Sequence, residues 1–408
     1  MKKFFFYSIL VFLIIVYIYS IVFDAIPVSP KIVLEGVGVL YCFKYITSNK
    51  YLLRREYKVI IAIILIIASW DIITSFLNGQ SEYHLIKDKL PIIGSIFGAQ
   101  FIYKYSRRYI KEPDTFLFIV VMTIMGESLL ALSMKASPTL YSIVDSVLLF
   151  DYGSDEFDMF NLARIMGIGN AIYFGVLASC VMGVMTAVYL LVKEKSVIKR
   201  ILLIVAWIVI SATSFLTARW SLFPIALSAL LFVISLTNHK LSYVLGIVLL
   251  FLVIGGVALS VLYTNVDSDS LKWATAFFVD RESSDHSADL VLEWWQTTGF
   301  ELNTFFIGDA RYTDPNYGYY KRVDIGFFRE IFYGGIIGLF LIIYSHYLVL
   351  KFNFKYNTEK EFGKTLIFLM LGYLAAMAKG NISLMSPFIL YLVFYTEGIF
   401  KKRSTVNI

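Results

Sequence analysis

Arginine residues at the ends of apolar segments are the residues of this sequence best suited to carry chemistry. A guanidinium group keeps its charge at physiological pH and donates paired hydrogen bonds to phosphate oxygens. The clearest case is Arg219, in the run Thr217-Ala218-Arg219-Trp220-Ser221 between two apolar segments. A guanidinium group within hydrocarbon costs about 2.5 to 3.5 kcal/mol, so such a residue usually faces a cavity or the interior of a helix bundle. The alternative role is that of an anchor at the lipid headgroups.

Five further arginines are candidate ligands of an anion: Arg164, Arg281, Arg311, Arg322 and Arg329. Arg322 and Arg329 are seven residues apart, so two helical turns would place them on one face with Gly326 between them. The structural alternative is pairing with nearby carboxylates or, for Arg164, anchoring at the membrane surface. Guanidinium groups gathered on one side of a membrane indicate a phosphate-bearing ligand. A departing diphosphate gains negative charge, which fixed cations stabilise in the transition state.

Signatures of other chemistries are absent from the sequence. It has no glycine-rich loop of the nucleotide-binding type, no paired-cysteine metal site and no Ser/His/Asp signature. The four histidines have no metal-ligand spacing, and Cys42 and Cys180 lie in apolar runs where a thiol packs as a small hydrophobic group. We therefore expect no metal and no cofactor. The lack of a nucleotide site argues against an ATP-driven pump, so any energy must come with the substrate or from a gradient.

The composition defines the class of protein that must position these residues. Of the 408 residues, 58% are hydrophobic and 16% are charged, against about 45 to 50% and 25% in soluble domains. The mean hydropathy of +0.73 is too high for one buried core. These values indicate an all-α polytopic membrane protein, in which many apolar segments face lipid. They exclude a nucleic-acid-binding domain, a secreted disulfide scaffold and a disordered chain.

Twelve apolar segments are candidates to cross a bilayer as helices. They are residues 4–23, 28–47, 59–77, 90–104, 114–135, 168–192, 200–217, 220–237, 241–263, 324–350, 364–379 and 381–400. The second segment is weakened by Glu35 and Lys44, and the fourth is short. With the N-terminus inside, the inner connections hold 22 Lys and Arg residues and the short outer ones hold seven, so the positive-inside rule places both termini in the cytoplasm. The net charge of +6 then reflects topology.

The expected organisation has three parts. Residues 1–263 form transmembrane helices one to nine, residues 264–323 form a long outer loop, and residues 324–408 form helices ten to twelve and a cytoplasmic tail. Within the loop, residues 287–296 have apolar pairs at i,i+4 spacing and predict a short amphipathic helix. Loops of this length are commonly functional, so we expect this one to act as a lid on the outer surface.

Three motifs are grouped around the arginines. The first is Leu216-Thr217-Ala218-Arg219-Trp220-Ser221, and the second is Arg164 followed by Gly169-Asn170-Ala171-Ile172-Tyr173-Phe174. The third joins Phe306-Ile307-Gly308-Asp309 to the run 324–338, which contains the pair Gly334-Gly335. Across residues 160–345 these motifs resemble those of the Wzy-type oligosaccharide repeat-unit polymerases, relatives of the O-antigen ligases. Ala218 stands where that family usually has serine.

The resemblance implies a metal-independent glycosyltransferase of the C superfamily at the outer leaflet of a bacterial cytoplasmic (inner) membrane. Such an enzyme transfers a growing glycan from undecaprenyl diphosphate to the next lipid-linked repeat unit, in the synthesis of a capsule or of the O antigen of lipopolysaccharide. The implied partners are the undecaprenyl-diphosphate-linked oligosaccharide, membrane lipids and a chain-length regulator protein. A nucleic acid is not expected.

This hypothesis gives each candidate residue a role. The arginines divide into three binding groups: Arg219 and Arg164 for the donor diphosphate, Arg281 and Arg311 for the loop and for diphosphate or glycan, and Arg322 and Arg329 for the acceptor. The catalytic candidates are Arg219, Asp324 and His286. Asp324 or His286 would be the general base, although the departing diphosphate can itself take up the proton.

Two other functions remain open from the sequence. A ligase of the related group would use a finished surface lipid or protein as acceptor; the family's ligases usually carry an outer histidine, for which this chain offers only His286 in the loop. A lipid-linked oligosaccharide flippase should show inverted repeats and a charged cavity at the midplane. Glu35, Asp71 and Glu127 lie within or near the predicted spans, where they would be either proton-coupling sites or helix–helix hydrogen-bonding groups.

Overall fold

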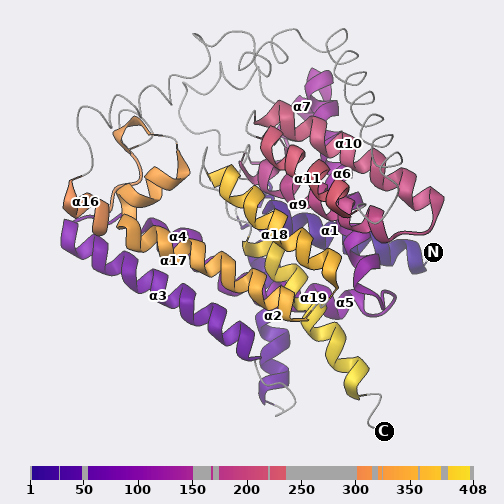
Figure 1. Cartoon of the computed structure of the whole chain (residues 1–408), viewed down its shortest axis with the longest axis horizontal. Coiled ribbons are helices and arrows are strands. Elements are labelled where there is room, and N and C mark those ends of the chain that lie inside the picture. Colours follow the sequence, from indigo (N-terminus) through magenta and orange to yellow (C-terminus); the bar gives the residue numbers. More distant parts are fainter. Residues whose placement is uncertain are drawn as a thin grey trace. The chain divides into compact units, whose positions relative to one another are not determined.

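The computed structural model describes most of the chain and is α-helical (Figure 1). The described residues are 2–26, 28–47, 54–149, 167–168, 174–218, 221–235, 301–314, 320–323, 325–356, 359–377 and 385–404. Within them, six helices are long and apolar enough to cross a membrane: α1 (Lys2–Tyr19), α3 (Arg55–Asn78), α6 (Pro113–Ala136), α9 (Phe174–Lys193, with its span at Val176–Lys193), α10 (Val197–Thr217) and α17 (Gly326–Tyr356). The chain therefore has the architecture of a multi-pass membrane protein.

The predicted apolar segments agree with the helices that form. Eleven of the twelve coincide with a described helix, and segment 241–263 lies outside the described residues, as does the predicted amphipathic helix 287–296. Six of the eleven reach the length and hydropathy of a span, so the total of twelve stays a prediction. Three short helices were not foreseen, because segments of five to eight residues carry too few periods to be recognised: α4 (His84–Lys89), α7 (Pro138–Asp145) and α16 (Leu302–Phe306).

The helices divide into two compact units, each assembled from separate parts of the sequence. Unit 1 contains α1, α6, α7, α9, α10, α11 (Leu222–Ser235) and nearly all of α18 (Lys360–Met377). Its central element is α9, whose span is 89% buried and packs against α6, α10 and α11. Gly372 of α18 approaches Val181 and Met185 of α9 closely, so α18 packs on the same helix.

Unit 2 is also assembled from three separate parts of the chain. It contains α2 (Pro30–Thr47), α3, α4, α5 (Pro91–Ser106), α16, the short 3-10 helix η3 (Tyr320–Arg322), α17 and α19 (Met385–Ser404). Helices α3 and α17 lie side by side, and α16 packs at one end of α17 (Figure 1). Helix α3 ends at Gly79, whose left-handed backbone (φ 61°) lets its N–H reach the carbonyls of Phe76 and Ser75. This end leads directly into the loop 79–83 and α4.

Helix α17 is interrupted at Gly335, inside the predicted tenth span. Gly335 has φ 66° and ψ −175°, a conformation open almost only to glycine. The interruption frees carbonyl groups, and the segment after α16 occupies them: the N–H of Asp309 donates to Phe332 O (2.6 Å) and that of Ala310 donates to Tyr333 O (3.0 Å). Trp70 of α3 donates its indole N–H to Gly334 O (2.8 Å). The predicted continuous helix is therefore two helical segments with the loop docked at their junction.

Replacing Gly335 with alanine should destabilise the protein strongly. The backbone strain alone costs about 1 to 3 kcal/mol, and the added Cβ would lie 2.2 Å from the carbonyl oxygen of Phe306. Gly126→Ala on α6 is the matched control, because nothing lies within 4 Å of its Cβ position. Thermal unfolding of the purified variants should show a lower midpoint for Gly335→Ala only. Equal midpoints would mean that the junction does not need a glycine.

Candidate functional site

Three side chains from separate elements of unit 2 form a stack. The imidazole of His84, at the start of α4, lies on the ring of Tyr312 with 3.4 Å between centroids and 14° between planes. The guanidinium carbon of Arg329, in the first turn of α17, lies 3.9 Å from the centroid of the same ring. Two groups so close to one centroid must occupy opposite faces. We call His84, Tyr312 and Arg329 the cation–aromatic stack; such contacts contribute about 0.5 to 2 kcal/mol.

The loop between α3 and α4 fixes the position of the stack. The Glu82 carboxylate accepts hydrogen bonds from the backbone N–H of Tyr312 (2.8 Å) and from the hydroxyl of Thr313 (3.1 Å). With its amide oxygen facing Arg311, Gln80 accepts from Nη2 (3.1 Å) and Nε (3.2 Å) of that arginine. Arg311 is exposed and Arg329 is partly exposed. Arg311 thus precedes Tyr312 in the chain, and Arg329 lies over the Tyr312 ring.

Asp71 of α3 connects the stack to the break in α17. Its fully buried carboxylate accepts hydrogen bonds from the hydroxyl of Tyr333 and from the N–H of Ile86 (2.8 Å). The Tyr333 oxygen in turn accepts from the N–H of His84 (2.7 Å). One carboxylate therefore ties α3, α4 and α17 together. This is the helix–helix hydrogen bonding that was one of the two roles predicted for Asp71.

The loop that docks at the α17 junction has its own polar centre at Asp309. Its carboxylate accepts from the hydroxyls of Thr304 (2.6 Å) and Tyr320 (3.1 Å) and pairs with Lys321 (3.1 Å). The Lys321 ammonium also lies 4.9 Å from the ring centroid of Phe332. Burial, together with the negative Asp309, raises the pKa of Tyr320 to about 12, so the phenol stays protonated and can donate. These contacts connect the segment after α16 to η3 and, through Lys321, to Phe332 of α17.

Behind the stack lie three ionisable side chains that we call the buried charge group: Asp88, Lys89 and Glu330. Lys89 and Glu330 are 2% and 1% exposed, and the Lys89 ammonium pairs with Asp88. Burial disfavours the charged forms of both Asp88 and Lys89, which belong to α4. The attraction between the two charges is stronger than this effect. Asp88 and then Glu330 raise the pKa of Lys89, and chiefly Lys89 lowers the pKa of Asp88. Lys89 is therefore cationic and Asp88 anionic at neutral pH.

His84 contributes no charge to this environment. Burial, aided by the neighbouring cations Lys89 and Arg329, lowers the pKa of His84 to about 4. At neutral pH its ring is an uncharged stacking partner for Tyr312. Among the residues that the structure describes, no group of three or more His, Cys, Asp or Glu side chains is placed to hold a metal ion. The site offers cations, aromatic faces and carboxylates instead.

The structure describes only some of the site residues that the sequence predicts. Arg164, Arg219, Arg281, His286 and Asp324 lie outside the described residues. Arg329 lies over the ring of Tyr312, and Arg311 precedes Tyr312 in the chain and contacts Gln80. The face shared by Arg322 and Arg329 was wrongly predicted: Arg322 ends the separate helix η3, Lys321 before it has a left-handed φ of 54°, and α17 begins only at Gly326. No continuous helix relates the two positions.

Several residues of the site carried no usable signal in the sequence. His84 and Lys89 belong to a helix too short to predict, and Tyr312 is one of 28 tyrosines. Glu330 directly follows Arg329 in the sequence, where a carboxylate is most simply interpreted as an ion-pair partner. The one available signal is the cluster of charged residues at 82–89, directly before the apolar segment 90–104, and such clusters flank many spans.

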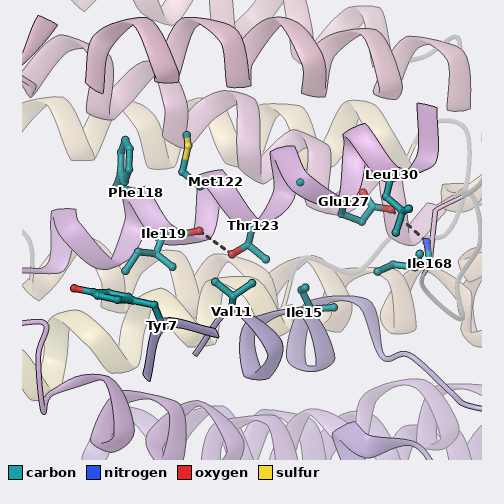
Figure 2. A pocket seen from close by; sticks show the side chains of 11 residues that line it. Tyr7, Val11, Ile15, Phe118, Ile119, Met122, Thr123, Glu127, Leu130 and Ile168 are labelled. Atoms are coloured by element: carbon teal, nitrogen blue, oxygen red, sulfur yellow. Dashed lines mark hydrogen bonds between the residues drawn. The ribbon is translucent and has the colours of Figure 1, made fainter. Parts of the chain in front are cut away.

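Unit 1 contains a cavity of different character (Figure 2). It has a volume of about 340 Å³ and lies along α1 and α6, with Tyr7 toward one end and Glu127 and Ile168 toward the other. Oε1 of Glu127 accepts the N–H of Ile168 (3.3 Å), and Thr123 donates to the carbonyl of Ile119. The eleven lining residues include no Lys, Arg or His, so this cavity does not suit a diphosphate.

The fold and the site together define a multi-pass α-helical membrane protein with an arginine-bearing aromatic site in unit 2. Comparisons of the chain with protein-family models, with curated proteins and with solved structures gave no match. The function must therefore be argued from the residues themselves.

Proposed function

We propose that the chain is a glycosyltransferase that polymerises lipid-linked oligosaccharide repeat units at the outer leaflet of a bacterial cytoplasmic membrane. In the reaction, a hydroxyl group of the acceptor attacks the anomeric carbon of the donor glycan. A new C–O bond forms as the bond to undecaprenyl diphosphate breaks, and the leaving diphosphate keeps the electron pair. The proton of the hydroxyl passes to a base or to the departing diphosphate.

The observation that carries this proposal is the placement of Arg311 and Arg329 about Tyr312. The Arg329 guanidinium lies over the Tyr312 ring, and a planar guanidinium is the group best suited to pair with phosphate oxygens. Gln80 and Glu82 accept hydrogen bonds from Arg311 and from the Tyr312 N–H, so the segment is held in place before a ligand arrives and little ordering is needed on binding. Because the acceptor is itself linked to a lipid diphosphate, this pair fits the acceptor side of the reaction.

The remaining roles rest on the sequence resemblance. Arg219 and Arg164 would bind the donor diphosphate and stabilise the charge that develops on it. Arg281 would shape the outer loop, and Arg322 would assist the acceptor. Asp324 or His286 would serve as base if one is needed. The proposal also includes a chain-length regulator protein as a partner, the bacterial cytoplasmic membrane as the location, and a cytoplasmic position for both termini.

Incubation of the purified, reconstituted protein with undecaprenyl-diphosphate-linked repeat units tests the proposal. The wild-type protein should convert them into a ladder of longer glycans without added metal or nucleotide. Arg219→Ala, expressed to the same level, should give no ladder. If intact donor yields no ladder with the wild-type protein, the enzymatic function is wrong; an unchanged ladder with Arg219→Ala removes that arginine from the mechanism.

A second candidate, lipid-linked oligosaccharide translocation, is favoured by the interruption of α17 at Gly335. Transporters commonly place their substrate site where a membrane helix is broken. Movement of a fluorescent lipid-linked oligosaccharide across vesicles without glycan elongation would decide for this function. Transfer only to a finished surface lipid or protein would instead identify a ligase.

A further inference from the structure

Glu330 is a buried carboxyl group with no hydrogen bond to the part of the chain that the structure describes. Its side chain is 1% exposed, and neither carboxylate oxygen has a hydrogen-bond partner among the described residues. An ionised carboxylate in such surroundings loses its hydration with no bond in exchange, which is strongly unfavourable. The group must therefore be balanced by neighbouring charges or carry a proton.

The neighbouring charges do not balance it. The charged groups that act on Glu330 are Lys89 and Asp88 from α4, Asp71 from α3 and Arg329 from its own helix. With Glu330 ionised, two cations would face three carboxylates, leaving one buried excess negative charge. His84 and His346 interact electrostatically with Asp88 and Lys89; the pKa of His84 is about 4, so its ring is neutral, and Nδ1 of His346 donates to Ile342 O (2.9 Å). Lys31, which interacts electrostatically with Asp88, also interacts with Glu35, so these two opposite charges leave the balance unchanged.

Among the three carboxylates, Glu330 is the one that must take up the charge-balancing proton. Asp71 accepts bonds from Tyr333 and Ile86, which stabilise its ionised form. Asp88 is paired with the Lys89 ammonium and is 34% exposed. Glu330 has neither kind of stabilisation.

We propose that Glu330 is a proton-binding site, neutral at physiological pH, and that its proton is coupled to anion binding at Arg329. Protonation removes a negative neighbour from the Arg329 guanidinium and so strengthens its hold on an anion. By linkage, an anion bound at Arg329 strengthens the hold on the proton by the same factor. The coupling rests on the proposed anion site, whereas the proton site itself does not.

Infrared spectroscopy of the purified full-length protein tests the proton site. The wild-type spectrum should contain the C=O band of a protonated carboxyl group near neutral pH, and Glu330→Gln should lose it. Glu361→Gln on α18, which removes a carboxylate paired with Lys364 (2.9 Å), is the matched control and should keep the band. Glu127 is also buried, with one oxygen unpartnered among the described residues, so the band is assigned from the difference between the wild-type and Glu330→Gln spectra; a difference spectrum without it would overturn the assignment.

Two further measurements keep the proposal testable if Glu330→Gln fails to fold. In Asp88→Asn, which removes a like charge at a partly exposed position, the band should disappear at a pH about one unit lower than in the wild type; no shift, or an upward one, would contradict the site.

Sulfate, which does not titrate in this range, should strengthen the wild-type band and make a weakly buffered solution more alkaline. A wild-type band that does not respond to sulfate would overturn the coupling while leaving the proton site in place.

Discussion

Replacement of Arg329 by alanine is expected to raise the KM for the acceptor lipid about a hundredfold while leaving kcat nearly unchanged. Two charge-assisted hydrogen bonds to a phosphate contribute about 3 kcal/mol together, and each 1.4 kcal/mol is a factor of ten in affinity. The acceptor diphosphate carries the same charge in the ground state and in the transition state. Loss of the Arg329 contact therefore weakens the binding of both states equally. Initial-rate measurements at varied acceptor concentration separate KM from kcat.

The same assay on two further variants tests whether the effect on KM depends on the planar pair of donors of Arg329. Arg329→Lys keeps the charge but not the planar pair of donors, so it should recover only part of the loss. Arg108→Ala is the matched control, since Arg108 also lies over a tyrosine of unit 2, 5.5 Å from the ring centroid of Tyr105, at a predicted cytoplasmic position. An unchanged acceptor KM in Arg329→Ala would remove the cation–aromatic stack from the binding site.

Replacement of Asp71 by leucine is expected to be the most destabilising of the single changes. It leaves two buried donors, the hydroxyl of Tyr333 and the N–H of Ile86, without their acceptor. Each such group costs about 1 to 3 kcal/mol, so the free energy of unfolding should fall by about 2 to 6 kcal/mol. Unfolding in mixed micelles, followed by intrinsic fluorescence, measures this change.

A double-mutant cycle tests whether the loss arises from these bonds. In a Tyr333→Phe background one donor is already gone, so Asp71→Leu should cost less than in the wild type. Tyr344→Phe, on the exposed side of the same helix, is the control and should leave the cost unchanged. Additive effects of Asp71→Leu and Tyr333→Phe would show that the carboxylate does not act through Tyr333.

Sequence patterns predicted the helices well and their contacts poorly. Segments such as 59–77 and 114–135 became α3 and α6 with shifts of a few residues, because an apolar run of that length has few ways to bury its backbone polar groups. The double glycine of the tenth segment was visible, but the break at Gly335 depends on the loop carbonyl of Phe306 that lies against it. Arg322 illustrates the limit, since its position depended on where α17 begins.

The sequence by itself determined that this is a multi-pass helical membrane protein and where most of its helices lie. It also indicated arginines as the residues most suited to bind an anion. Only the tertiary structure decided that His84, Tyr312 and Arg329 stack on one another and that Glu330 is buried with no hydrogen bond to any described residue. The reason is physical: hydropathy is a property of each segment and can be summed along the chain. A site depends on pairs of residues far apart in sequence, whose distance is set by packing alone.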